Sequence, residues 1–141
     1  MANKIRLGVI GAGGATWANR AHFPALAHNP DFELTAVCTT RPESAEAARQ
    51  KYGAKLAFHD FRQMAASPDI DAVAVVVRVP SHYDPTKAAL EAGKHVMLEK
   101  PVALCAEQAE ELQRLALAQQ RTVAVDFEYR AVPLFQQLAQ L

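Results

Sequence analysis

The sequence has little cysteine, no excess of charge of either sign and no long apolar run. Its two cysteines, Cys38 and Cys105, make no disulfide framework and belong to no cluster with the spacing of metal ligands. The 15 basic residues balance 15 acidic ones, which argues against nucleic acid or an acidic membrane surface as a partner. No apolar segment approaches the roughly 20 residues of a membrane-spanning helix, and no signal peptide precedes the first predicted strand. These absences predict a cytoplasmic protein that holds no metal.

Apolar segments of strand length alternate with helical segments along the 141 residues, a length suited to one domain with a buried core. Residues 72–77 are all apolar, which is typical of a central parallel strand covered on both faces. The alternation predicts an α/β fold, a doubly wound parallel sheet of about six strands with helices on both faces. The predicted strands are residues 5–10, 32–39, 55–58, 70–77, 95–98 and 122–127. The predicted helices are residues 17–28, 40–52, 61–66, 85–92, 106–119 and 133–141.

Two of the predicted helices contain a proline, one in the interior and one in the first turn. Pro24 lies inside residues 17–28, and since proline in a helix interior costs about 3 kcal/mol, we expect a bend near Phe23. In the helix over residues 40–52, Thr40 and Glu43 have the spacing of a capping box, and Pro42 falls in the first turn, where proline is tolerated.

The first predicted strand leads into a glycine-rich turn. Gly11 and Gly13 let the backbone turn and come close to a ligand, and the N–H groups that begin the following helix suit an anion. In this context the anion is the pyrophosphate of a dinucleotide. Thr16 stands where a G-x-G-x-x-G motif has its third glycine, and we expect this departure to affect packing more than phosphate contact. The predicted pyrophosphate site comprises Gly11, Gly13, Gly14, Ala15 and Thr16.

Residues 88–101 carry a more specific pattern, A-A-L-E-A-G-K-H-V-M-L-E-K-P. It resembles the Gfo/Idh/MocA oxidoreductases, which include glucose-fructose oxidoreductase and inositol dehydrogenase, and the resemblance extends from Ile5 to about Leu138. The resemblance implies that residues 1–130 form a nicotinamide-binding Rossmann domain. It also implies that residues 131–141 begin the connection to a second domain, absent from this sequence, that carries most of the substrate site and the oligomer interface.

The resemblance implies that Lys100 is catalytic. In the family this lysine touches the substrate hydroxyl and the nicotinamide ribose, and it assists proton transfer as hydride moves. A positive charge at the carboxyl end of a strand can stabilise the oxyanion charge that develops in such a reaction. Glu99 and Pro101 flank Lys100, and the resemblance implies that Glu99 and Lys100 also contact the cofactor. The Lys100–Pro101 bond is a candidate for the cis form. The alternative is an ordinary surface lysine.

Thr39, Thr40 and Arg41 follow the second predicted strand and bear on the choice of cofactor. An acidic residue here would bind the ribose 2′-OH of NAD, and none is present. Hydroxyl groups and a guanidinium can instead hold the 2′-phosphate of NADP. We therefore predict NADP, with NAD as the alternative cofactor. In the simpler interpretation Thr40 caps the helix together with Glu43, and Arg41 is solvated.

The loop after the fourth predicted strand departs from the family pattern of threonine-proline-asparagine followed by a histidine. Val79 replaces the threonine, Pro80 is retained, Ser81 replaces the asparagine and His82 is displaced. In the family this loop lies on the nicotinamide side. The resemblance therefore implies backbone contacts from Val79 and Pro80, whereas His82 is either a contact to the ligand or a loop histidine.

Two further side chains are predicted near the cofactor. Arg130 matches an arginine that the family places after the sixth strand, and its alternative is a salt bridge to Asp126 or Glu128. Trp17 either lines the nicotinamide pocket or packs against the protein. We interpret three histidines without a partner at ligand spacing as structural or surface residues: His22, His28 and His59.

Together these features predict the NADP- or NAD-binding domain of an oxidoreductase. The enzyme would transfer hydride between the nicotinamide and a sugar, a polyol or a similar hydroxyl or carbonyl compound, and would work as a homo-oligomer. The isolated 141 residues are expected to bind cofactor without turnover. The alternative is a non-catalytic regulator of the same fold that senses NAD(P), and the retained run from Glu99 to Pro101 favours the enzyme.

Overall fold

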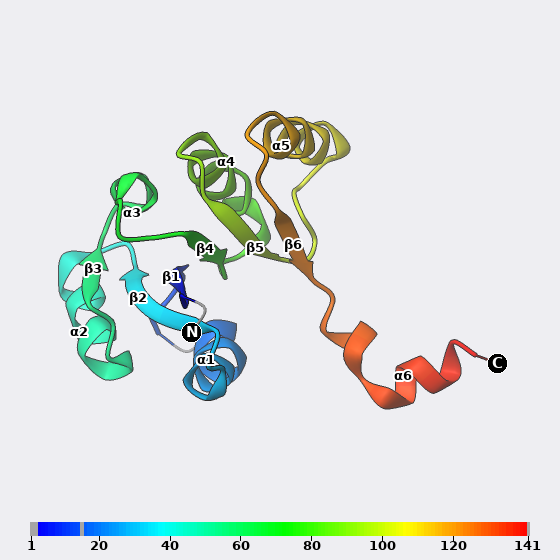
Figure 1. Cartoon of the computed structure of the whole chain (residues 1–141), viewed down its shortest axis with the longest axis horizontal. Coiled ribbons are helices and arrows are strands. Elements are labelled where there is room, and N and C mark those ends of the chain that lie inside the picture. Colours follow the sequence, from blue (N-terminus) through cyan, green and yellow to red (C-terminus); the bar gives the residue numbers. More distant parts are fainter. Residues whose placement is uncertain (1–2, 15, 141) are drawn as a thin grey trace.

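The computed structural model describes residues 3–14 and 16–140 and contains a six-stranded sheet (Figure 1). Its order is β3-β2-β1-β4-β5-β6, and each neighbouring pair is parallel. The predicted doubly wound parallel sheet is therefore confirmed. The strands are β1 (Ile5–Ile10), β2 (Phe32–Cys38), β3 (Leu56–Phe58), β4 (Ala72–Val75), β5 (His95–Glu99) and β6 (Val123–Asp126).

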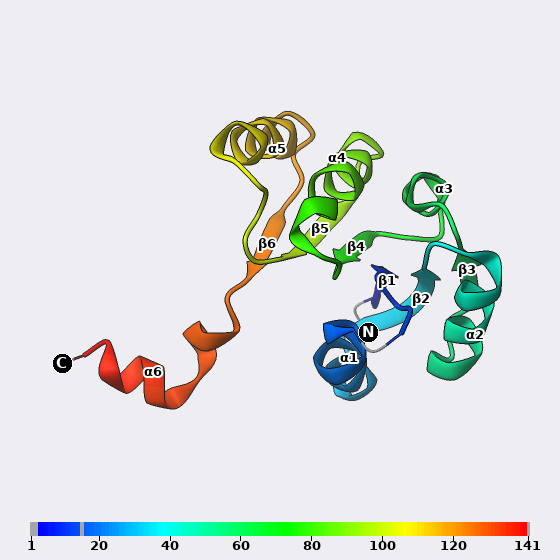
Figure 2. The same ribbon diagram turned by 180° about the vertical axis from the view of Figure 1, so that it is seen from behind.

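Helices cover both faces of this sheet (Figure 2). In both views α1 and α2 lie on one face and α3, α4 and α5 on the other, while α6 extends away from the sheet. No helix within the described residues combines the length and the apolar composition needed to cross a membrane. The helices are α1 (Phe23–His28), α2 (Pro42–Tyr52), α3 (Phe61–Ala66), α4 (Tyr83–Glu91), α5 (Ala106–Ala118) and α6 (Pro133–Leu138).

The continuous apolar run through β4 supplies both faces of the core. Val73 and Val75 pack into a cluster with the residues of α3, α4 and α5, such as Leu90. Ala72 and Ala74 belong to the second cluster, on the α1 and α2 side. Because successive strand residues point to opposite faces, a strand covered on both sides needs apolar residues at every position. This requirement explains the pattern that identified β4 as a central strand.

The structure differs from the sequence prediction at two helix starts. The segment expected to be one helix is π-helical over η1 (Ala18–His22) and becomes α1 at Phe23, with Pro24 in the first turn of α1, where the missing N–H of proline is tolerated. The predicted capping box of Thr40 and Glu43 is wrong. The N-cap residue of α2 is Arg41, and no side chain makes a capping hydrogen bond there.

The two cysteines differ in burial and are expected to differ in reactivity. Cys38 at the end of β2 is buried, and this burial raises the pKa of its thiol to about 12. Cys105 is exposed just before α5. Since the thiolate is the reactive form, iodoacetamide at about pH 8 should alkylate Cys105 alone in the native chain and both cysteines after unfolding in urea. Peptide mass spectrometry measures this, and equal native labelling of Cys38 and Cys105 would contradict the buried position of Cys38.

Candidate functional site

The segments predicted to bind cofactor gather at one edge of the sheet. Parallel strands bring their carboxyl ends to the same edge, and ligands of doubly wound sheets bind where the strand order reverses. Here the order reverses at β1, which lies between β2 and β4. The loops that follow β1, β2, β4, β5 and β6 carry the predicted site residues, so the topology brings all five loops together.

The glycine-rich turn after β1 is shaped by close contact with the neighbouring strand. Gly11 has φ +102°, and a Cβ at this position would lie 2.0 Å from the carbonyl oxygen of Val76. Only glycine fits such a position. The hydroxyl of Thr16 donates a hydrogen bond of 2.9 Å to the carbonyl oxygen of Gly11. Thr16 thus closes the turn through its side chain. The sequence did not suggest this role, because the G-x-G-x-x-G motif has a glycine at this position.

Side chains from η1 and α2 support this turn from outside. Asn19 donates from Nδ2 to the carbonyl oxygen of Gly14, and Tyr52 donates its hydroxyl hydrogen to Oδ1 of Asn19. The ring of Tyr52 stacks on Phe23 with centroids 3.8 Å apart. Trp17 is 48% exposed, which disfavours the packing alternative and leaves the indole accessible to a ligand. Ala15, also predicted to bind cofactor, lies outside the described residues.

The end of β2 presents hydroxyl and guanidinium groups and no acid. Thr39 shares a hydrogen bond of 2.6 Å with Ser44 and donates to the backbone oxygen of Arg41, so its hydroxyl shapes the turn into α2. The side chains of Thr40 and Arg41 are exposed. Thr39 and Thr40 line a cleft of about 530 Å³ together with Gly11, Pro80, His59 and Arg62.

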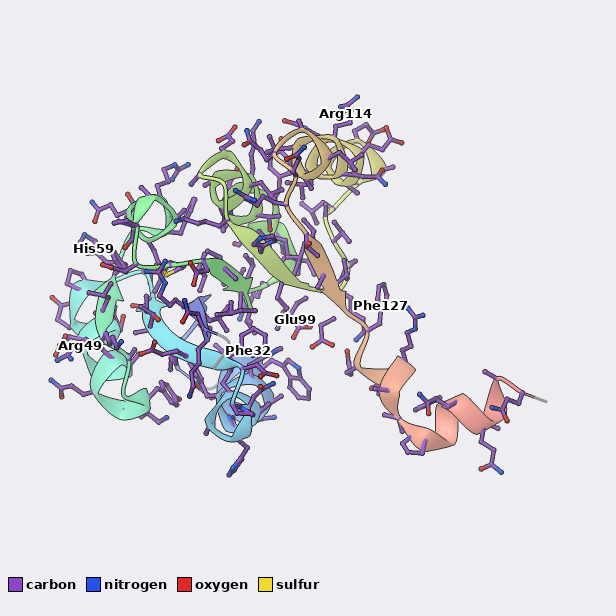
Figure 3. The ribbon with its side chains drawn as sticks, viewed as in Figure 1. Phe32, Arg49, His59, Glu99, Arg114 and Phe127 are labelled. Atoms are coloured by element: carbon purple, nitrogen blue, oxygen red, sulfur yellow. The ribbon has the colours of Figure 1, made fainter. Side chains whose placement is uncertain are left out.

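His59 was interpreted from the sequence as a surface or structural residue. Figure 3 shows it between β3 and α3, and it lines the same cleft as Thr40. Sequence reasoning missed His59 and Arg62 because neither belongs to a recognisable motif. Their position depends on β3 lying beside β2 in the sheet.

The loop after β4 forms the short 3₁₀ turn η2 (Val79–Ser81). His82, which follows it, is fully buried. Its Nδ1 lies 2.8 Å from the carbonyl oxygen of Pro101, and its Nε2 lies 2.9 Å from that of Val77. Both ring nitrogens therefore face protein oxygens, and no atom of His82 is open to a cofactor. The expected ligand contact is corrected to the loop alternative, since His82 joins the loops after β4 and β5.

The end of β5 contains a buried pair of polar side chains. The Lys100–Pro101 bond is cis, as expected. Glu99 is 9% exposed, and its Oε1 lies 2.5 Å from Nε2 of His22 in η1. Oδ2 of Asp126 lies 4.0 Å from the same nitrogen. This buried contact agrees with the structural interpretation of His22. The sequence did not reveal its partner, which lies 77 residues away, because no local spacing connects them.

Lys100 is paired with the segment that follows β6. Its Nζ donates a hydrogen bond of 2.7 Å to Oε1 of Glu128 in η3 (Glu128–Ala131) and lies 5.2 Å from the centre of the Tyr129 ring. The hydrogen bond raises the pKa of Lys100 and lowers the pKa of Glu128. Arg130 is exposed, and among the described residues Glu128 pairs with Lys100, which leaves the alternative salt bridge of Arg130 unsupported.

Figure 3 shows Glu99 at the end of β5 and Phe127 on the chain leaving β6, near the same edge. The register pairs Glu99 with Asp126, so the residues that follow each strand lie within reach of one another. The edge thus has a glycine turn at β1, hydroxyl and guanidinium groups at β2, and an ammonium group beyond β5. This arrangement suits an extended anionic ligand with a reactive end near Lys100.

Comparison with known proteins agrees with this geometry. A D-glucoside 3-dehydrogenase of Escherichia coli is 38% identical over 134 residues, which cover 95% of this chain and 38% of that protein. An inositol 2-dehydrogenase of Rhizobium meliloti is 32% identical, covering 93% and 38% respectively. The crystal structure of KijD10, a 3-ketoreductase from Actinomadura kijaniata in complex with NADP, superposes with a TM-score of 0.89 at 32% identity, covering 98% of this chain and 43% of that one.

The chain thus spans about two fifths of the length of these relatives. The family model described as "Oxidoreductase family, NAD-binding Rossmann fold" matches residues 5–127, which is most of the chain. The parallel sheet and the glycine turn after β1 are the features expected of such a Rossmann fold. The chain belongs to the Gfo/Idh/MocA oxidoreductase family and contains its NAD-binding Rossmann domain.

Proposed function

We propose that this chain is the NADP-binding domain of an oxidoreductase that acts on a hydroxyl or carbonyl group of a sugar or polyol. The observation that carries the proposal is that the glycine turn at Gly11 and Lys100 both lie at the carboxyl edge of the same sheet. Relatives named for a D-glucoside, for inositol and for a ketoreductase complex with NADP support this class of substrate and cofactor. The regulatory alternative is less well supported, because these relatives are dehydrogenases and reductases and Glu99-Lys100-Pro101 is retained.

The domain arrangement of the whole protein is part of this proposal. Residues 1–130 are the cofactor domain, and residues 131–141 begin the connection to a second domain that would carry most of the substrate site. In α6, Phe135 and Leu138 are 47% and 52% exposed, apolar surface that such a domain could cover. We place the whole protein in the cytoplasm as a homo-oligomer.

The residues present fit a dinucleotide. A Cβ built on Gly14 would have no atom within 4 Å, so the turn is open to a phosphate on that side. The pyrophosphate would be held by Gly11, Gly13, Gly14 and Thr16, and Trp17 would line the nicotinamide pocket. Thr40 and Arg41, supported by Thr39, would hold the 2′-phosphate. The nicotinamide side would be formed by the backbones of Val79 and Pro80, by Arg130, and by Lys100, which follows buried Glu99.

Bound NADP would supply the hydride acceptor, and NADPH the donor. Lys100 would act by electrostatics and hydrogen bonding at the substrate oxygen. Its ammonium carries three N–H donors, of which Glu128 takes one. A lysine is charged at neutral pH, and the hydrogen bond to Glu128 raises the pKa of Lys100 further, which favours the charged ammonium. Its Nζ can therefore stabilise negative charge on a substrate oxygen and need not remove the proton itself.

Titration calorimetry on the 141-residue chain tests cofactor choice. We expect NADPH to bind more tightly than NADH. Arg41→Ala should weaken NADPH binding about tenfold or more, the loss expected for one charge-assisted phosphate contact, and leave NADH binding nearly unchanged.

Arg114 provides the matched control, because it is exposed on α5, far from the cleft (Figure 3). Arg114→Ala removes the same charge and should leave both affinities unchanged. Tighter binding of NADH than of NADPH would overturn the cofactor assignment. Absence of binding of either nucleotide at millimolar concentration would overturn the proposed function.

A further inference from the structure

The partner of Lys100 is supplied by the loop after β6. Glu128 lies 28 residues further along the chain and accepts the hydrogen bond from Nζ at 2.7 Å. The ring of Tyr129, the next residue, lies 5.2 Å from the same nitrogen. The two side chains of the pair are 34% and 31% exposed. The ammonium thus contacts a carboxylate and an aromatic face, both from the loop after β6.

The fold fixes the backbone that carries Glu128. The β5–β6 register ends with Glu99 opposite Asp126, which brings the two loops that follow these strands together. The η3 turn is closed by hydrogen bonds from Arg130 N to Phe127 O at 2.8 Å and from Val132 N to Tyr129 O at 3.2 Å. Glu128 therefore sits in a hydrogen-bonded turn close after β6, so the sheet and the turn together place its backbone beside the loop that carries Lys100.

Glu99 is the acid nearest to Lys100 in the sequence, but it does not serve as the partner. Its carboxylate is buried against His22, with Oε1 and Nε2 2.5 Å apart. Because Glu99 is committed to the first helical segment, Glu128 is the acid at this edge that holds the ammonium. Lys100 therefore pairs with an acid from another loop, 28 residues away, and not with the acid beside it in the sequence.

The second oxygen of Glu128 is buried on the side away from a polar partner. Its Oε2 is buried and has no hydrogen-bond partner within the part of the chain that the structure describes. An unpaired buried acceptor is costly, whereas half-exposed ion pairs contribute little to folding. A carboxylate kept under these conditions beside Lys100 is more easily explained by its effect on the lysine than by its contribution to folding.

We propose that Glu128 is a positioning residue that holds the Lys100 ammonium at the carboxyl edge of β5, where it meets the reacting end of the cofactor and the substrate oxygen. The proposal rests on the proposed function, because the role of Lys100 belongs to it. Glu128 occupies one N–H of Nζ and leaves two for ligand oxygens. It acts through Lys100 and is not itself assigned a contact with substrate.

Competitive acylation tests the pairing without any ligand. Acetic anhydride reacts with free amines, and mass spectrometry compares Lys100 with exposed Lys51 in the same chain. Glu128→Gln removes the carboxylate that keeps Lys100 protonated, so at about pH 9 the Lys100 to Lys51 rate ratio should rise about fivefold to tenfold. Glu110→Gln on α5 should leave the ratio unchanged, and Glu128→Asp, which keeps the charge, should give an intermediate ratio. An unchanged ratio in Glu128→Gln would overturn the proposal, provided circular dichroism shows the variant to be folded.

Saturating NADPH tests whether the pairing positions Lys100 for the cofactor. In the wild type, NADPH should slow acylation of Lys100, whereas in Glu128→Gln at saturation this protection should fall at least twofold. Equal protection in both proteins would also overturn the proposal. Failure of the wild type to bind NADPH would contradict the proposed function, and the ligand-free acylation ratio would still decide whether Glu128 holds Lys100.

Discussion

The Gly11→Ala variant is expected to lose about 4 kcal/mol of unfolding free energy and to bind no NADPH at concentrations that saturate the wild type. The new Cβ would lie 2.0 Å from the carbonyl oxygen and 2.8 Å from the carbonyl carbon of Val76. Both atoms are backbone, so only a shift of β1 against β4 could relieve the contact. The φ of +102° adds strain for any residue with a side chain. Urea denaturation followed by circular dichroism measures the stability, and calorimetry measures the binding.

Gly14→Ala is the matched control in the same turn. Gly14 also has a positive φ, of +68°, but a Cβ there would have no atom within 4 Å. Its replacement should cost only backbone strain, about 1 kcal/mol. Similar stability losses for Gly11→Ala and Gly14→Ala would show that the contact with Val76 does not determine the requirement for glycine.

The His22→Ala variant is expected to lose about 3 kcal/mol of unfolding free energy, because it leaves the buried carboxylate of Glu99 without its partner. His22 and Glu99 are each 9% exposed, so water cannot easily replace the lost contact. The measurement is again urea denaturation. His22→Gln keeps a side-chain N–H donor and should lose less.

His28→Ala provides the control, because His28 is exposed on the neighbouring α1 and its loss should change stability by no more than about 0.5 kcal/mol. A second substitution sharpens the test. In the His22→Ala background, Glu99→Gln removes the unpaired charge and should recover part of the loss. If His22→Ala were as mild as His28→Ala, the pair with Glu99 would have no role in stability.

Local patterns predicted most of the fold. The apolar run through β4 and the glycine turn after β1 report burial and backbone geometry, which depend on residues close in the chain. The helix starts were less accurate, because the capping role of Thr40 and the π-helical form of Ala18–His22 depend on competing hydrogen bonds that spacing does not reveal. The predicted ends of the strands lay within two residues of the observed ends, and both ends of β1 matched.

The partners within the candidate site could not be predicted in the same way. His22 was interpreted as structural or surface, and the structure places it on Glu99. His82 was expected either to meet the cofactor or to support the loop, and its burial favours the loop. Glu128 was considered as a partner for Arg130, yet it binds Lys100. Each outcome depends on which segments from different strands meet at the carboxyl edge of the sheet.

The amino-acid sequence by itself determined the parallel α/β fold, the glycine turn and the family pattern ending in Glu99-Lys100-Pro101, because these are encoded in runs of neighbouring residues. Only the tertiary structure decided how the charged groups at the edge are paired, with His22 on Glu99 and Glu128 on Lys100. Several acids of similar chemistry lie near these strand ends in the sequence. The choice among them follows from the β5–β6 register and from the packing of the first helical segment, which are set by the whole sheet.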